Sequence, residues 1–249
     1  MATVFLSPSL QDFNPYITGN GSEADFMNRL ADKMIPGLLL NGIPLSRSNP
    51  NGTVADAIAK SNAYAPDLHV SLHSNAAPDG MSGQLQGPEV YYYRDSDNGR
   101  RAAELIGAQL AQVYPYDETV QLIPMDDELA ELVRTKAPAV FIEVGYHDNI
   151  DDARWIENNL QTIANAINRG IADYLEIPFS DTDNAQIGRV QVTSGTLNLR
   201  SAPSTNAPIL GSLQNDEIVV ILRSVPNWVQ ILSGIGVGYA ASQYIERLT

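Results

Sequence analysis

The chain has 249 residues, of which 44% are hydrophobic and 18% charged, a composition typical of a globular protein with one medium-sized domain and a small one. Its formal net charge of −14 argues against nucleic-acid binding, because an acidic surface repels phosphates. The absence of cysteine excludes disulfides, thiolate metal ligands and a cysteine nucleophile. No apolar run predicts a membrane span and no signal peptide is visible, so the export route stays open.

Strand-like and helix-like segments alternate through residues 3–175. The predicted strands are short and rich in apolar and β-branched residues: 3–7, 43–47, 68–73, 89–94 and 139–145. The predicted helices carry apolar residues at helical spacing: 22–42, with Ser22 as N-cap and Gly42 at its end, then 53–64, 99–114 and 153–175. This order predicts an α/β domain with a mostly parallel, twisted sheet flanked by helices.

The chain changes character after residue 176. A polar, turn-prone stretch at 177–186 is typical of a linker, and short β-rich runs separated by turns follow it. The pattern predicts a helix-containing domain at 1–176 and a small all-β barrel or sandwich at 187–249.

Three polar residues are candidates for a functional site, and two of them lie at the ends of predicted strands, where a parallel sheet places its site. Glu143 ends the apolar run 139–142, so partial desolvation should raise its pKa into the range useful for general acid/base catalysis. His73 ends the strand 68–73, on the same face as His69 and about 13 Å from it, too far for both to bind one metal. Glu23 lies in the first turn of a helix, where the helix dipole alone would favour a carboxylate.

Other chemistries find little support in the sequence. No serine-nucleophile elbow, phosphate-binding loop or dinucleotide fingerprint occurs. What remains is a His/Glu set suited to a catalytic zinc that keeps one position open for water. A strand-end histidine bound only by structural hydrogen bonds would give the same pattern at His73.

Read in order, these segments resemble the zinc-dependent N-acetylmuramoyl-L-alanine amidases of the Amidase_3 type. The similarity rests on "GNGSEADFMNRLADKM", "IPLSR", "APDLHVSLHSNAA", "GPEVYYY" and "TKAPAVFIEVGYHDN" and spans about residues 3–175. The resemblance implies Glu23 and His73 as zinc ligands and Glu143 as the catalytic glutamate.

The chain departs from that family at its first zinc ligand. The family opens with Asp-Pro-Gly-His-Gly, whereas this chain has "SPSLQ", with Leu10 at the histidine position. The third ligand is therefore Gln11 through its carbonyl oxygen, His147 four residues beyond Glu143, or a water molecule. Histidine binds zinc more readily than an amide oxygen does, whereas its place in the sequence favours Gln11.

The C-terminal segment resembles the bacterial SH3-type (SH3b) domains. "TLNLRSAPSTNAPILGSL", "NWVQIL" and "GVGYAASQYI" carry the similarity, with Tyr239 in place of the usual tryptophan and Ala202 in place of a glycine. That family implies binding of cell-wall peptides, although Leu197, Leu199 and Trp228 would also serve simply to fill a small core.

Both resemblances imply a peptidoglycan hydrolase that acts on the bacterial cell wall and cleaves the amide between N-acetylmuramic acid and L-alanine. The missing histidine motivates an alternative, a zinc-free peptidoglycan-binding protein without catalysis. A zinc peptidase that cuts within the stem peptide is a third hypothesis.

Overall fold

A computed structural model of the chain describes residues 2–116, 120–181 and 185–248. The chain divides into two compact units, one made of Ala2–Met34 and Leu45–Phe179 and the other including Ile35–Pro44 and Ser180–Thr249. None of the helices in the described ranges has both the length and the apolar character needed to cross a membrane.

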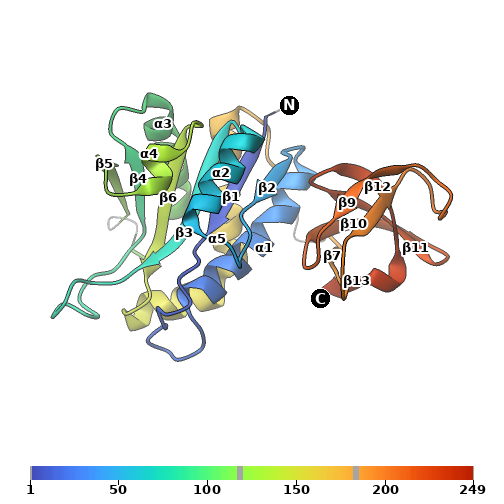
Figure 1. Ribbon diagram of the computed structural model, residues 1–249. Helices are drawn as coiled ribbons and strands as arrows, with labels where there is room; N and C mark the ends of the chain where they lie inside the picture. The colour runs from blue at the N-terminus through green and yellow to red at the C-terminus, as the bar shows by residue number, and fades with distance from the viewer. Residues whose placement is uncertain (1, 117–119, 182–184, 249) are drawn as a thin grey trace. The chain divides into compact units, whose positions relative to one another are not determined.

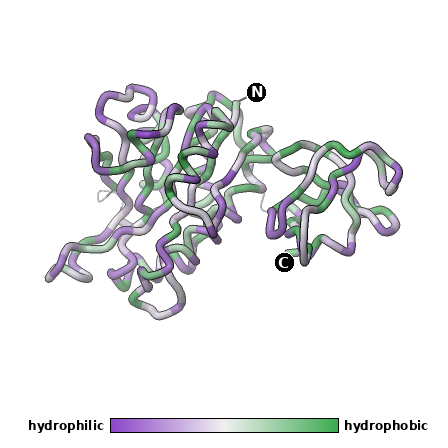
Figure 2. Tube along the Cα trace, viewed as in Figure 1, coloured by the Kyte–Doolittle hydropathy of each residue, from purple (hydrophilic) through white to green (hydrophobic). Residues whose placement is uncertain are grey.

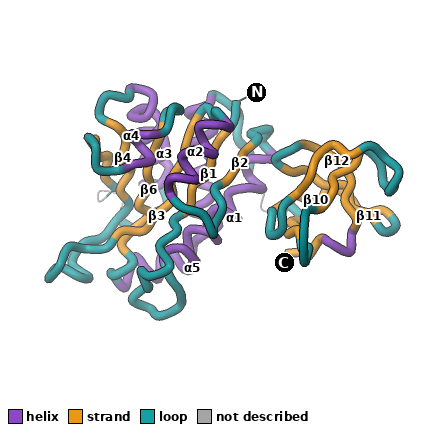
Figure 3. Tube along the Cα trace, viewed as in Figure 1, coloured by secondary structure: helices purple, strands orange, loops and turns teal. Residues whose placement is uncertain are grey.

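The first unit is built on a six-stranded sheet with the order β2-β1-β3-β6-β4-β5 (Figures 1 and 3). All neighbouring strands are parallel except β4 and β6, which run antiparallel. The strands are β1 (Val4–Pro8), β2 (Leu45–Arg47), β3 (Leu68–Asn75), β4 (Glu89–Tyr93), β5 (Gln121–Met125) and β6 (Ala139–Tyr146). The predicted α/β class with a mostly parallel sheet is confirmed.

Helices cover both faces of this sheet. They are α1 (Glu23–Leu40), α2 (Val54–Tyr64), α3 (Asp97–Ala111), α4 (Ala130–Arg134) and α5 (Ile150–Leu175), the last broken at Asn159. In Figure 1, α2 and α4 lie on one face and α3 and α5 on the other. The hydrophobic colour in Figure 2 runs along the strands between these layers.

The two faces of the sheet differ in chemistry. The face under α3 and α5 is apolar, with buried side chains such as Val70, Leu72, Val140 and Ile142. The opposite face carries the alternate residues of the same strands, among them His69 and His73. Because strand side chains alternate, the polar face is the one that can hold a site.

Several helix ends lie where the sequence places them. Ser22 accepts a hydrogen bond from the Asp25 backbone N–H at 3.2 Å while the Asp25 carboxylate accepts from the Ser22 N–H, which makes Ser22 an N-cap as predicted. Gly42 follows the end of α1 with a φ of +74°, a left-handed conformation that glycine adopts without strain.

The sequence prediction missed two elements, β5 and α4. β5 is an edge strand that pairs only with β4, and Pro124 interrupts its pattern; an edge position tolerates a residue without an N–H donor. α4 spans only five residues, too few to show a helical period.

The second unit contains an all-antiparallel sheet of seven strands among its described residues, in the order β13-β7-β10-β11-β12-β8-β9. Its elements are β7 (Ile187–Val190), β8 (Leu197–Arg200), β9 (Ile209–Leu213), β10 (Ile218–Val225), β11 (Trp228–Ser233), β12 (Gly236–Ala241), a 3₁₀ turn η2 (Ser242–Tyr244) and β13 (Ile245–Leu248). Leu197 and Leu199 are buried in its core, whereas Trp228 is partly exposed. The predicted all-β domain is confirmed.

The expected boundaries at 176 and 187 remain predictions. The expected linker 177–186 includes residues 182–184, which lie outside the described residues.

Candidate active site

The candidate residues gather at one edge of the six-stranded sheet. β3 and β6 run parallel toward this edge and carry His73 and Glu143, direct register partners, two and three residues before their last residues. Gln11 follows β1 at the same edge, and Glu23 begins α1. The parallel direction of β1, β3 and β6 thus brings together residues far apart in sequence.

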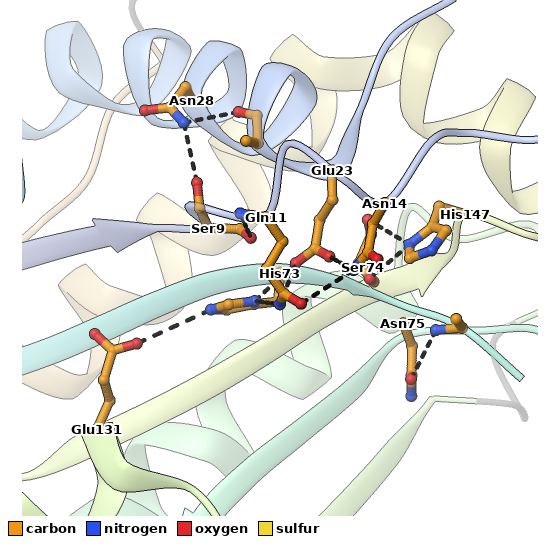
Figure 4. Close-up of polar contacts among 12 residues, drawn as sticks. Ser9, Gln11, Asn14, Glu23, Asn28, His73, Ser74, Asn75, Glu131 and His147 are labelled. Atoms are coloured by element: carbon orange, nitrogen blue, oxygen red, sulfur yellow. Dashed lines mark hydrogen bonds and ion pairs between the residues drawn. The ribbon is translucent and has the colours of Figure 1, made fainter. Parts of the chain in front are cut away.

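Three polar side chains converge at this edge (Figure 4). The His73 Nδ1 atom lies 2.8 Å from Glu23 Oε1, and the Gln11 Nε2 atom lies 3.4 Å from the same oxygen and 3.5 Å from His73 Nδ1. Glu23 is 1% exposed and His73 8% exposed. The structure therefore places Glu23, His73 and Gln11 side by side.

Asn14 fixes the orientation of two of these groups. Its Nδ2 donates hydrogen bonds to Gln11 Oε1 at 3.0 Å and to Glu23 Oε2 at 2.9 Å. As a result the amide nitrogen of Gln11, not its oxygen, faces His73. Sequence reasoning did not single out Asn14, which lies in a polar loop without a pattern.

His73, Glu143 and Glu89 form a row across β3, β6 and β4, in which each residue pairs in register with the next. Glu143 is the middle residue of this row. Its Oε2 atom is buried and has no hydrogen-bond partner among the described residues, while the residue as a whole is partly buried. Burial raises the pKa of Glu143 to about 8, the charge of His73 opposes this shift, and the carboxylates of Glu23 and Glu89 reinforce it. A carboxyl with this pKa exchanges protons near neutral pH.

Glu89 continues the row on the other side of Glu143. Because β4 runs antiparallel to β6, its first residue pairs in register with Glu143. The Glu89 carboxylate accepts hydrogen bonds from Tyr146 Oη at 2.8 Å, from Asn75 Nδ2 at 3.0 Å and from the Tyr91 hydroxyl. Glu89 is therefore fully paired, whereas Glu143 keeps one oxygen free.

The paired groups Glu23 and His73 influence each other's protonation. Burial alone would raise the pKa of Glu23, but its hydrogen bond to His73 and the charge of that ring lower it. Burial alone would lower the pKa of His73, but the carboxylates of Glu131, Glu23 and Glu143 outweigh it and raise the pKa to about 9. Without a metal the pair is an ion pair.

The structure holds the other two histidines outside this group. The His147 Nδ1 lies 2.8 Å from the Ser74 carbonyl oxygen and 3.2 Å from its hydroxyl, and its ring stacks on Tyr16. His69 is fully buried and contacts Glu131. As expected, His69 and His73 share a face of β3, and of these two only His73 lies beside Glu23.

The donor set accommodates part of a zinc site. Ligands 2.0–2.1 Å from a tetrahedral zinc lie about 3.3 Å apart, close to the separations among Glu23, His73 and Gln11. Across the described ranges, however, no three His, Cys, Asp or Glu side chains form a metal-binding group. Glu23 and His73 fit zinc, whereas the Gln11 amide beside them presents its nitrogen and would have to turn to offer its oxygen.

This fold is that of the peptidoglycan amidase domains. Residues 12–173 match the Amidase_3 family, described as N-acetylmuramoyl-L-alanine amidase, and residues 195–246 match a bacterial SH3 domain. The chain belongs to the N-acetylmuramoyl-L-alanine amidase family and carries a C-terminal bacterial SH3 domain. Both domains indicate interaction with peptidoglycan at the cell wall.

Solved structures share the fold at low sequence identity. The chain is similar to an N-acetylmuramoyl-L-alanine amidase from Clostridium difficile 630, with 22% identity, a TM-score of 0.63 and coverage of 70% of this chain and 97% of the other. It is also similar to the catalytic domain of the amidase CwlV from Bacillus (Paenibacillus) polymyxa var. colistinus, with 20% identity, a TM-score of 0.62 and coverage of 72% and 100%.

A curated relative matches more narrowly. The uncharacterized protein YqiI of Bacillus subtilis (strain 168) is 30% identical over 129 residues, which cover 50% of this chain and 59% of the relative. The chain thus spans about three fifths of the relative's length.

Proposed function

We propose that this protein hydrolyses the amide bond between the lactyl carbonyl of N-acetylmuramic acid and the L-alanine of the stem peptide. The observation that carries the proposal is the strand-end row of His73 and Glu143, with Glu23 and Gln11 converging on the histidine. The family membership of the chain supports the substrate. In this proposal residues 1–176 form the catalytic domain, 177–186 the linker and 187–249 the cell-wall-binding domain.

Glu143 serves as the proton carrier of the reaction. Its free Oε2 accepts a proton from the attacking water, and the carboxyl then delivers that proton to the nitrogen of the leaving L-alanine as the C–N bond breaks. A pKa of about 8 suits both steps, because the group gains and loses its proton near neutral pH.

Glu23 and His73 would hold the zinc ion. When bound, zinc would polarise the scissile carbonyl and lower the pKa of a water molecule. We propose Gln11 as the third ligand in place of His147, because the Gln11 amide group lies within 3.5 Å of both Glu23 and His73 whereas His147 Nδ1 contacts Ser74.

Product analysis of digested cell wall tests the proposal. Purified peptidoglycan treated with the full chain should release peptides that begin with L-alanine and leave intact glycan strands, as read by mass spectrometry. Glu143→Gln and a chelator should each abolish release, whereas Glu128→Gln, which changes an exposed glutamate, should not. Peptides with new ends inside the stem would identify a peptidase instead.

The alternative of a zinc-free wall-binding protein has one observation in its favour, namely that the described residues bring together only two of the usual zinc-binding side chains. Metal analysis decides between them. Near-stoichiometric zinc in the purified protein supports the amidase, and binding to peptidoglycan without zinc or product release supports the alternative.

A further inference from the structure

A buried glutamate on α4 links two histidines of β3. Glu131 is 5% exposed, and its Oε1 lies 3.1 Å from His69 Nε2 while its Oε2 lies 3.9 Å from His73 Nε2. Glu131 and Glu23 approach the His73 ring from opposite sides (Figure 4). Each ring nitrogen of His73 therefore faces its own carboxylate.

His69 anchors one end of this link. Its ring is fully buried, its Nδ1 lies 2.9 Å from the Ser61 hydroxyl on α2, and it stacks on Phe5 of β1. Because His69 is held on both sides, the Glu131 oxygen that contacts it is fixed as well. Glu131 is thus a rigid partner for His73.

Polar groups surround the buried Glu131 carboxylate. His69 and His73 lie beside its two oxygens, and the Ser7 hydroxyl is a further partner. A buried carboxylate needs such partners, and these groups of β1 and β3 provide them.

Packing against an aromatic ring fixes the plane of the His73 ring. The ring stacks on Phe141 with centroids 4.1 Å apart and an interplanar angle of 16°. Within that stack, a half-turn of the ring would point C–H groups at Glu23 and Glu131. Both carboxylates disfavour that orientation, so Glu131 helps to select the one with Nδ1 toward Glu23.

We infer that Glu131 is a positioning residue for His73, holding Nε2–H on its own side so that Nδ1 stays on the side of Glu23 and Gln11, where its lone pair would bind zinc. The inference rests on the proposed function insofar as His73 is the histidine that holds zinc. Metal-binding histidines commonly donate their second ring N–H to a carboxylate, and loss of that partner commonly costs 10- to 100-fold in metal affinity or activity.

A purely structural role is the competing explanation, in which Glu131 only serves as the hydrogen-bond partner of His69 and attaches α4 to the sheet. The two roles differ in what they change. A structural role alters the stability of the fold, whereas a positioning role alters the affinity for zinc and the orientation of the His73 ring at unchanged folding.

The Glu131→Gln variant separates these roles because it keeps the shape of the side chain. Its amide would accept from His69 through Oε1 and direct its NH₂ group at His73 Nε2, which favours a proton on the wrong ring nitrogen. We expect zinc affinity, measured by competition with a chromophoric chelator, to fall about 10- to 100-fold. Glu131→Asp should recover part of the loss, and Glu128→Gln should match the native protein.

Kinetics and NMR supply readouts that a structural role would not move. Because Glu131 does not touch substrate, kcat on peptidoglycan fragments should fall with little change in KM. In metal-free protein the ¹⁵N signals and ring-current shifts of His73 should show one ring orientation in the native chain and a different or mixed one in Glu131→Gln.

The outcomes distinguish this inference from the proposed function. If the native protein neither binds zinc nor releases peptides, the proposed function fails, while the metal-free NMR comparison still decides whether Glu131 orients His73. If Glu131→Gln binds zinc as the native protein does and keeps its His73 signals, the inference is overturned. If that variant does not fold, the zinc-loaded native protein decides: a proton on Nδ1 instead of Nε2 would contradict it.

Discussion

Replacing Glu143 with glutamine should stabilise the metal-free protein at neutral and alkaline pH while it removes hydrolysis. The pKa of Glu143 is raised from 4.5 to about 8, so between these values the folded state keeps a proton that the unfolded state has released. Stability therefore falls as pH rises through this window. At about 1.4 kcal/mol per pKa unit, this effect lowers the free energy of unfolding of the native chain, relative to its value at pH 4, by about 3 kcal/mol at pH 7 and about 5 kcal/mol above pH 8.

Urea unfolding of both proteins at pH 4, 7 and 8.5, without metal, measures this effect. Glutamine cannot ionise, so the stability of the variant relative to the native chain should grow by about these amounts between pH 4 and pH 8.5. The unpaired amide adds an offset that does not depend on pH. A stability difference that is constant across this range would refute the reasoning, and Glu128→Gln serves as the exposed control.

Three further experiments, which use four substitutions, test the site and the packing of the fold. Gln11→Ala should weaken zinc binding at least tenfold in a competition titration, whereas His147→Ala should not, because of these two residues only Gln11 lies beside Glu23. The reverse result would make His147 the ligand. Gly170→Ala should lower unfolding free energy by about 1–3 kcal/mol in chemical denaturation, since its Cβ would lie 2.5 Å from a backbone atom of α3; an unchanged midpoint would contradict the close packing. Asp152→Ala removes the acceptor of two backbone N–H groups and a tyrosine hydroxyl, so its thermal midpoint should drop by several degrees, and a native midpoint would argue against that network.

The residues that sequence could place are those tied to a pattern. Glu143 follows an apolar run and His73 lies near the end of a neighbouring strand, so the direction of the sheet brings them to one edge. The structure also confirms that His69 and His73 share a face, since strand alternation alone determines it.

The residues that sequence could not place act across elements. Glu131 lies on a five-residue helix, and its neighbours along the chain give no hint that two histidines of β3 flank its carboxylate. Asn14 is one of several asparagines in polar loops, and only the three-dimensional fold shows that it binds both Gln11 and Glu23. Such contacts depend on tertiary packing, which local periodicity does not encode.

The strand order has a consequence for how the chain matures. β3 and β4 follow one another in sequence, yet β6 lies between them in the sheet. Until residues 139–146 have been synthesised and inserted, both of those strands keep an open edge where β6 will pair, and open edges invite association with other chains. The same insertion delivers Glu143, so an incomplete chain has no proton carrier, and capacity for hydrolysis arises together with closure of the sheet.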